Sequence, residues 1–286
     1  MSTSTVPTLA LLDDFSLEIT GKDAPALETT KHLIPPGAQI NVTFLGNEDL
    51  DDRVAAAAAV REHGFRPVPH VSARRLRSEA QLREFLERLR QVEATEAVFA
   101  VGGDPHVPEG PYEDSLALIR SGLFEEYGVR HVSIAGYPGG HPDISDDALW
   151  AALDEKVAAL DQQGFCTSLV TQLGFDASAV LSWIGAVRKR GVDVPVRVGV
   201  PGPAGVKRLL SFARRCGIGS SAGIAKKYGF SLTNLMGTAG PDRFITDLAA
   251  GLDEQCAGQV SLHFYTFGGV RAMSEWAHSF REARTS

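Results

Sequence analysis

The segment RHVSIAG (residues 130–136), together with the residues up to Gln172, indicates the fold of the chain. It is a short run of β-branched and small apolar residues that leads into the polar, glycine-rich loop YPGGHP (137–142). A helical stretch comes next over Ser145–Gln162, and a second apolar run, CTSLVTQ, occupies Cys166–Gln172. A strand, a long helix and a second strand in this order are typical of a parallel β-α-β unit. This part of the sequence therefore predicts an α/β fold with a parallel sheet.

The same alternation continues in both directions along the chain. Strands are expected at Phe15–Thr20, Gln39–Leu45, Arg66–Val71, Glu96–Gly102, Arg130–Gly136, Cys166–Gln172, Pro195–Val200 and Gln259–Phe267. Helices are expected at Ala24–His32, Asp51–His63, Ser78–Val92, Tyr112–Ser121, Ser145–Gln162, Ala177–Lys189, Ala204–Cys216 and Gly269–Ala283. Alternation of this kind favours a closed (β/α)8 TIM barrel.

The 286 residues are expected to form a single barrel domain (1–286), in which residues 1–14 are an N-terminal extension. Barrels of about 250 residues are common as one domain. The interval before the eighth strand is longer than the others. It leaves room for two extra helices, near Ser221–Tyr228 and Pro241–Gln255.

Composition and charge exclude several classes of protein. The chain is 44% hydrophobic and 22% charged, as is ordinary for a folded globular protein. Its 28 Lys and Arg against 35 Asp and Glu give a net charge of −7, so we expect no nucleic-acid partner. It has no apolar run of about 20 residues and no basic segment before an apolar run, so we expect neither a membrane span nor a secretory signal. The cysteines, Cys166, Cys216 and Cys256, have no zinc-site spacing, which favours a cytoplasmic protein without a metal site.

Polar side chains occur where six of the predicted strands end. They are Glu18, Thr20, His70, Ser72, Asp104, Tyr137, His141, Gln172, Asp176, His263 and Tyr265. The carboxyl ends of barrel strands meet at one rim, and barrel enzymes carry their active sites there. We expect no comparable set at the opposite rim. Each residue alone has an ordinary interpretation, such as a turn aspartate at Asp104 or a core tyrosine at Tyr265. The set as a whole indicates a site.

Glu18 is the strongest single candidate. Ser16, Glu18 and Thr20 share one face of the first predicted strand, and Phe15, Leu17 and Ile19 share the other. If the apolar face packs under the helices, Glu18 points into the mouth of the barrel.

The motifs at these strand ends resemble those of the methylenetetrahydrofolate reductases. They read SLEI (16–19), PHVSAR (69–74), GGDP (102–105), AGYPGGHP (135–142), VTQLGFD (170–176) and HFYTF (263–267). The resemblance extends from Phe15 to about Arg271. It implies a TIM barrel that transfers a hydride from NADH or NADPH to 5,10-methylenetetrahydrofolate and gives 5-methyltetrahydrofolate.

The resemblance also implies roles for single residues. Glu18 matches the general acid that protonates the departing nitrogen, which requires that burial raise its pKa. Asp104 matches the aspartate that holds the pterin ring and stabilises the cationic iminium. A substrate-binding role is implied for Gln172, His70, Tyr265 and Asp176, and a cofactor-binding role for Tyr137, His141 and Lys156.

Two departures from the family pattern concern FAD, which most members carry. Gly102 stands where the family has the arginine of its R-G-D motif. The segment before the sixth strand, LDEKVAALDQQGF (153–165), retains Lys156, but Leu149, seven residues before this lysine, stands where the family has an acidic residue. We therefore hypothesise a flavin-independent branch that uses NADH or NADPH directly, unless Arg74 or Arg75 replaces the missing arginine.

Other functions remain open at this point. The chain could be a pterin- or folate-binding barrel that acts as a methyltransferase, or a non-catalytic folate binder. It could also be an unrelated lyase that binds phosphate at Gly268 and Gly269. The sequence does not determine the oligomeric state, the direction of the reaction in the cell or the preference between NADH and NADPH.

Overall fold

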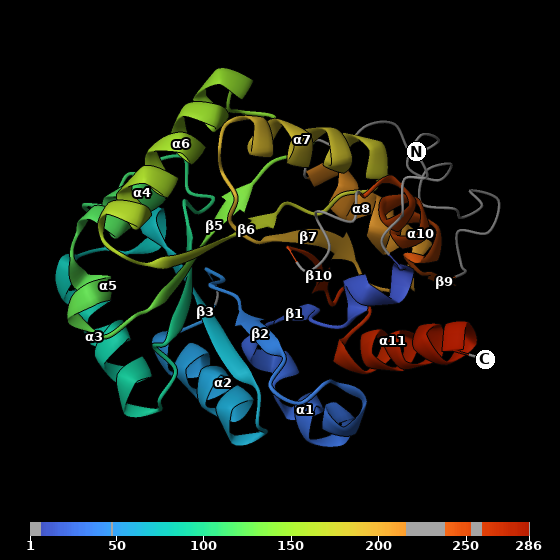
Figure 1. Ribbon diagram of the computed structural model, residues 1–286. Helices are drawn as coiled ribbons and strands as arrows, with labels where there is room; N and C mark the ends of the chain where they lie inside the picture. The colour runs from blue at the N-terminus through green and yellow to red at the C-terminus, as the bar shows by residue number, and fades with distance from the viewer. Residues whose placement is uncertain (1–6, 47, 216–237, 253–258, 286) are drawn as a thin grey trace.

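Parallel strands form a closed barrel in the computed structural model, which describes residues 7–46, 48–215, 238–252 and 259–285 (Figure 1). The barrel strands are β1 (Ser16–Ile19), β2 (Gln39–Val42), β3 (Arg66–Ser72), β4 (Ala97–Val101), β5 (His131–Gly136), β6 (Cys166–Thr171), β7 (Val196–Pro201) and β10 (Val260–Tyr265). Each strand pairs in parallel with both neighbours, and β1 pairs with β10 to close the ring. The predicted (β/α)8 TIM barrel is confirmed.

Helices surround the barrel as an outer ring (Figure 1). They are α1 (Pro25–Thr30), α2 (Leu50–Glu62), α3 (Glu79–Gln91), α4 (Ser115–Arg120), α5 (Leu123–Glu126), α6 (Asp146–Gln162), α7 (Ala177–Lys189), α8 (Val206–Arg215), α10 (Asp242–Gly251) and α11 (Val270–Thr285). Short 3-10 helices are η1 (Thr8–Leu12), η2 (Gly21–Asp23), η3 (Lys31–Leu33) and η4 (Ala73–Arg75). Side chains that accept a hydrogen bond from the first helical turn set where five of the helices begin, at Asp49, Ser78, Asp114, Ser145 and Asp176.

The predicted boundaries differ from the structure in a few places. Helix α4 begins after Asp114 rather than at Tyr112, because the Asp114 carboxylate caps it. Helix α8 begins at Val206 rather than at Ala204, since Ala204–Gly205 (β8) pairs in antiparallel fashion with Thr238–Ala239 (β9). Of the two extra helices, α10 confirms the one predicted near Pro241–Gln255. The one predicted at Ser221–Tyr228 lies outside the described residues.

The strand alternation divides the core into two parts. Leu17 and Ile19 of β1 are buried in the large cluster between the barrel and its helices. Inside the barrel the apolar cluster is small and consists of Val68, Ala97, Phe99 and Val170, with Val101 and Ala135 against it. Most other inward-facing positions are polar.

The opposite, N-terminal end of the barrel also contains buried polar groups, and the expectation that it carries no such set is wrong. Arg197, which is 8% exposed, donates from Nη1 to the carbonyl oxygen of Asp14 at 2.8 Å and from Nη2 to Asp14 Oδ2 at 2.6 Å. His131 Nε2 and Ser133 Oγ each lie 2.9 Å from Ser168 Oγ. The alternation in VRVGVP (196–201) turns Arg197 inward, so the sequence itself carries the signal for this buried group.

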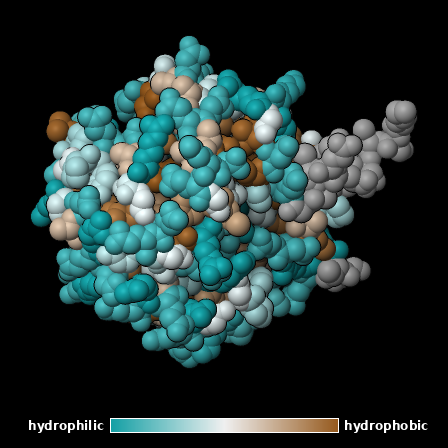
Figure 2. All heavy atoms as spheres, turned by 60° about the vertical axis from the view of Figure 1, so that its left-hand side comes forward, coloured by the Kyte–Doolittle hydropathy of each residue, from teal (hydrophilic) through white to brown (hydrophobic). Residues whose placement is uncertain are grey.

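The face of the molecule shown in Figure 2 is mostly hydrophilic, with hydrophobic side chains scattered singly or in small groups. No described helix combines the length and the apolar character that crossing a membrane requires.

Candidate active site

Glu18 lies at the centre of a polar cluster in the mouth of the barrel. Its Oε2 is 3.6 Å from His70 Nε2 and 3.7 Å from His263 Nε2. His263 belongs to the neighbouring strand β10, but His70 belongs to β3, which is two strands away from β1. A side chain on β1 reaches β3 only across the interior of the barrel. Glu18 therefore points into the mouth, as the strand pattern predicts.

Both histidines are held by other buried side chains. His263 is fully buried, and its Nδ1 is hydrogen-bonded to Ser16 Oγ at 2.8 Å. His70 Nε2 lies 3.4 Å from the Asn41 side-chain nitrogen on β2. His263 Nε2 is buried without a hydrogen-bond partner among the described residues, and it faces the Glu18 carboxylate. A buried polar atom without a partner is costly, so its retention at the mouth indicates a functional site.

Burial and charge set the protonation of this cluster. Burial lowers the pKa of His70 from 6.5 to about 4, and the nearby Glu18 carboxylate only partly offsets that effect. For Glu18, burial raises the pKa, but the approach of His263 and the positive charge available on His70 and His263 lower it more. The net direction is below the ordinary value of 4.5, which contradicts the expectation that burial raises the pKa of this residue. The sequence places His263 at the rim, but only the closed barrel brings its Nε2 to 3.7 Å from the Glu18 carboxylate.

Tyr265 and Gln172 lie on the same side of the mouth. The Tyr265 hydroxyl donates to the carbonyl oxygen of Thr171 at 3.2 Å, so the tyrosine reaches from β10 across β7 to β6. Gly199 makes this possible, because a methyl group there would overlap the Tyr265 ring. The Gln172 side-chain oxygen accepts from the backbone nitrogen of Leu173 at 3.0 Å. Its amide nitrogen makes no hydrogen bond to another described residue, which leaves a donor for a ligand.

Aromatic rings extend from Tyr265 away from the mouth. The rings of Tyr265 and Phe267 stack with centroids 5.8 Å apart, and those of Phe267 and Phe212 stack at 3.8 Å. Phe212 comes from α8. This continuous aromatic surface suits a flat, extended ligand.

Asp104 lies apart from the Glu18 cluster, in the loop after β4. Its side chain is 76% exposed, and both carboxylate oxygens accept hydrogen bonds from Arg75, at 2.8 Å from Nε and 2.7 Å from Nη2. The structure therefore separates the two predicted catalytic carboxylates into a buried one and an exposed one.

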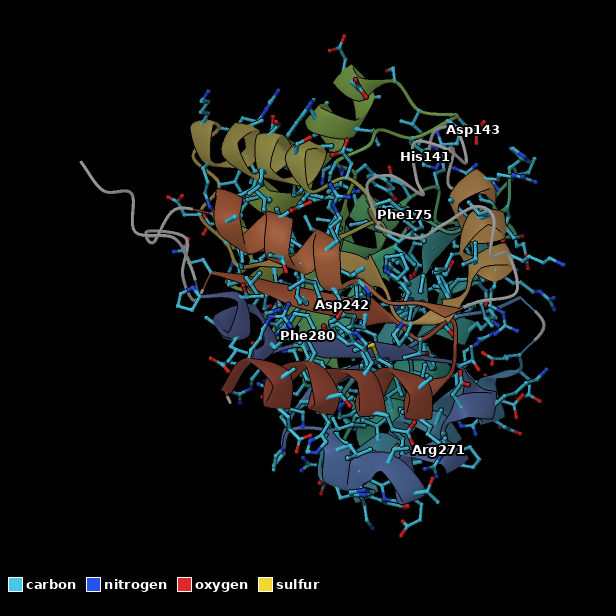
Figure 3. All side chains as sticks on the ribbon, turned by 90° about the vertical axis from the view of Figure 1, so that its right-hand side faces the viewer. His141, Asp143, Phe175, Asp242, Arg271 and Phe280 are labelled. Atoms are coloured by element: carbon cyan, nitrogen blue, oxygen red, sulfur yellow. The ribbon has the colours of Figure 1, made fainter. Side chains whose placement is uncertain are left out.

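The remaining predicted residues divide between the rim and the outside of the barrel. Tyr137 and His141 form an edge-to-face pair with ring centroids 5.6 Å apart, and burial raises the pKa of Tyr137. Figure 3 places His141 at the same end of the barrel as Arg271 at the start of α11, while Phe280 lies toward the other end. Asp176 caps α7 by accepting from the nitrogen of Ser178 at 3.2 Å and from its hydroxyl at 2.8 Å.

Lys156 is on α6, ten residues after the helix begins, or about 15 Å along its axis. Burial lowers its pKa, an effect that Asp114 at the start of α4 partly opposes. Its amine therefore lies between two outer helices rather than in the mouth.

Three residues of the cluster had no predicted role: His263, Asn41 and Ser16. The alternation of HFYTF and QINV places His263 and Asn41 on the inward face, and this was the available signal. Among the described residues, no group of three or more His, Cys, Asp or Glu side chains is arranged to hold a metal ion. Cys166 is free and exposed, and the other two cysteines lie outside the described residues.

Comparisons with known proteins agree with this architecture. The family model for methylenetetrahydrofolate reductase matches residues 26–276. "Methylenetetrahydrofolate reductase 2" of Saccharomyces cerevisiae is 28% identical over 190 residues, which are 61% of this chain and 30% of the yeast protein. This chain therefore aligns with less than a third of that relative.

A solved structure has a similar fold. It is an uncharacterised protein from Clostridium thermocellum, described as binding two copies of 5-methyl-5,6,7,8-tetrahydrofolic acid. The similarity covers 96% of this chain and 97% of that one, with a TM-score of 0.58 and 12% sequence identity. At this identity the likeness concerns the fold alone, whereas the family model covers most of the chain. The chain thus belongs to the methylenetetrahydrofolate reductase family.

Proposed function

We propose that this chain reduces 5,10-methylenetetrahydrofolate to 5-methyltetrahydrofolate, with NADH or NADPH as the hydride donor and Glu18 as the general acid. The observation that carries the proposal is the carboxyl group of Glu18, buried in the barrel mouth between His70 and His263 in a chain of this family. It is the acidic side chain of that cluster, at the place where barrel enzymes perform their chemistry.

The reaction needs a proton before it needs a hydride. The five-membered ring opens when the bond between the methylene carbon and one nitrogen breaks and the electron pair goes to that nitrogen. Glu18 donates the proton that this nitrogen takes up, and a cationic iminium remains. The hydride then adds to the iminium carbon with its electron pair, which gives the methyl group and the oxidised nicotinamide.

Glu18 must hold a proton at neutral pH to do this, although its pKa is lowered by its neighbours. A ring that covers the mouth excludes water and so disfavours the carboxylate. His70 has a pKa of about 4, so at pH 7 it is neutral and the lowering effect of its charge on the pKa of Glu18 is absent. His263 Nε2, which has no hydrogen-bond partner among the described residues, lies 3.7 Å from Glu18 Oε2 and faces the carboxyl group that donates the proton.

The remaining mouth residues bind the folate in this proposal. The free amide nitrogen of Gln172 donates to the pterin edge, and Asp104 accepts from its N–H groups. Tyr265 and His70 shape the pocket, and Asp176 supports it from the start of α7. Tyr137 and His141 contact the nicotinamide dinucleotide. Lys156, the third predicted cofactor residue, lies well along α6 near Asp114 and takes no part in this contact.

The residues present do not fit FAD well, which supports a flavin-independent reaction. The family arginine is missing at Gly102, where a Cβ atom would meet no other atom within 4 Å. Arg74 does not replace it, since its guanidinium donates to the carbonyl oxygens of Pro105, His106 and Glu113. The guanidinium of Arg75 is bound to Asp104.

The test is an anaerobic assay of NADH and NADPH oxidation by purified protein with 5,10-methylenetetrahydrofolate and no added flavin. We expect turnover by protein that shows no flavin absorption band. Turnover only after FAD is supplied would support the reductase activity but refute the proposal that the reaction is independent of flavin. If there is no turnover under either condition but calorimetry shows binding of 5-methyltetrahydrofolate, the reductase assignment is refuted. The chain would then be a folate binder or a methyltransferase.

A further inference from the structure

Arg75 is the last residue of η4, directly after β3, and its guanidinium meets the carboxylate of Asp104 from the next strand. The two side chains form a fork: Nε donates to Oδ1 at 2.8 Å and Nη2 donates to Oδ2 at 2.7 Å. We propose that Arg75 is a positioning residue, which holds Asp104 in the orientation that accepts hydrogen bonds from the folate ring. This inference rests on the proposed function, because it assigns Asp104 to folate.

The backbone on both sides of the fork is tightly fixed. Arg74 N donates to the carbonyl oxygen of Gly102 at 2.9 Å, and the Arg74 guanidinium binds three carbonyl oxygens of the loop that follows Asp104. Gly103 has φ of 96°, and a side chain there would also overlap Ser72 Oγ. Because the backbone of this loop is held in place, the Asp104 side chain can change its orientation mainly by rotation about its χ angles. The two hydrogen bonds from Arg75 restrict that rotation.

The position of the Arg75 guanidinium also depends on Gly46. A methyl group at Gly46, in the loop after β2, would overlap the guanidinium of Arg75. Gly46 does not have a positive φ, so alanine is compatible with its backbone. Replacement of Gly46 by alanine would therefore displace Arg75 without removing any charge.

A second ion pair joins the same two loops and provides a comparison, because it is exposed and has a single contact. Arg77 Nε lies 3.3 Å from Glu109 Oε2, and the Arg77 side chain is 78% exposed. The Arg75 side chain is only 20% exposed and uses two nitrogen atoms. Exposed single contacts contribute little, whereas a forked pair fixes orientation. Each oxygen of Asp104 keeps a further lone pair for donors of a ligand, and its 76% exposure leaves these accessible.

This arrangement accounts for the departure at Gly102. The positive charge that the family places two residues before the aspartate is absent here. Arg75 brings a guanidinium to the same aspartate from the neighbouring strand. In this chain its binding partner is the carboxylate itself, so its role is to orient Asp104 for the substrate.

The experiment compares Arg75→Gln, Arg75→Lys and Gly46→Ala with the matched control Arg77→Gln. The readouts are kcat, KM for 5,10-methylenetetrahydrofolate, and the Kd for 5-methyltetrahydrofolate by calorimetry. We expect Arg75→Gln to raise KM and Kd about tenfold, with kcat changed less than about threefold. Arg75→Lys keeps the charge and loses the fork, so it falls between Arg75→Gln and wild type, as does Gly46→Ala. Arg77→Gln leaves all three values unchanged.

A double-mutant cycle with Asp104→Asn separates positioning from a general structural effect. If Arg75 acts through Asp104, Arg75→Gln adds almost nothing to KM and Kd once Asp104 is asparagine. Additive effects, or wild-type KM and Kd in Arg75→Gln, would overturn the proposal. Wild-type protein that binds 5-methyltetrahydrofolate but does not turn over would refute the reductase and leave this inference to be decided by Kd. Wild-type protein that does neither would refute both.

Discussion

The two ends of the barrel interior differ in how their buried polar groups are satisfied. At the N-terminal end, Arg197 binds Asp14 through two nitrogen atoms, and His131, Ser133 and Ser168 form a hydrogen-bonded chain. None of these side chains leaves a buried polar atom without a partner. At the mouth, His263 Nε2 has no partner in the described part of the chain and faces Glu18 at 3.7 Å, beyond hydrogen-bond distance.

This difference distinguishes buried polar groups that stabilise the fold from buried polar groups that serve function. Both ends contain a histidine next to a serine, so residue type alone does not distinguish them. A fully satisfied network stabilises the fold, whereas an unsatisfied buried group lowers stability and is retained where it acts on a ligand. Substitutions at the mouth should therefore affect turnover, and substitutions at the other end should affect stability.

Glu18→Gln is expected to have the largest effect. The amide has nearly the same shape but cannot donate a proton as an acid, so kcat should fall by a factor of about 10² to 10⁴. The free energy of unfolding should also decrease somewhat, because the lowered pKa of Glu18 means that the folded state favours its carboxylate. NADH oxidation and urea unfolding measure the two quantities. Turnover within tenfold of wild type would contradict the role of Glu18 as the acid.

Asp14→Ala should show the opposite pattern at the N-terminal end. Arg197, which is 8% exposed, would lose its carboxylate partner, and we expect the free energy of unfolding to fall by about 1–2 kcal/mol. This figure is below that of a fully buried pair, because the Asp14 side chain is 60% exposed. The neighbouring Asp13→Ala is a matched control, since Asp13 is 77% exposed and lies 3.9 Å from Arg281. A loss of turnover in Asp14→Ala at unchanged stability would contradict the structural role of the N-terminal end.

The pH dependence of stability tests the environment of His70. Its pKa is about 4 when folded and 6.5 as the ordinary value, so the unfolded chain binds more protons between these pH values. The stabilisation by neutral His70 is complete above pH 6.5 and is lost as the pH falls toward 4. Wild type should thus lose about 1–3 kcal/mol of unfolding free energy over that range beyond what His70→Gln loses. Parallel curves for the two proteins in urea titrations would show that His70 is not buried as described.

The smallest effects are expected from a pair of serine variants. Ser168→Ala removes the partner of His131 and Ser133, and should lower the free energy of unfolding by about 1 kcal/mol with no change in kcat. Ser16→Ala removes the partner of His263 Nδ1, and should lower kcat by about threefold to tenfold through the orientation of that ring. Equal changes of kcat in both variants would mean that the two ends do not differ in function.

The sequence alone determined the fold class and the direction in which Glu18 points. Strand and helix periods are local properties, so the alternation of apolar and polar residues predicts both the eight-stranded barrel and the inward face of β1. The family motifs at strand ends were also readable, since each is a short contiguous stretch. The interior face of β7 and β10 followed the same rule. It placed His263 at the rim, and Arg197 could have been predicted in the same way.

Only the tertiary structure decided which of these residues meet and how each is charged. Glu18 comes within 3.7 Å of His70 and His263 because the barrel closes, and these residues are far apart in the sequence. That proximity reverses the expected direction of the Glu18 pKa, because electrostatic effects depend on distances through space. For the same reason the sequence did not distinguish the buried Glu18 from the exposed Asp104, or pair Asp104 with Arg75. Local sequence patterns determine which way a side chain faces, and barrel closure determines its neighbours.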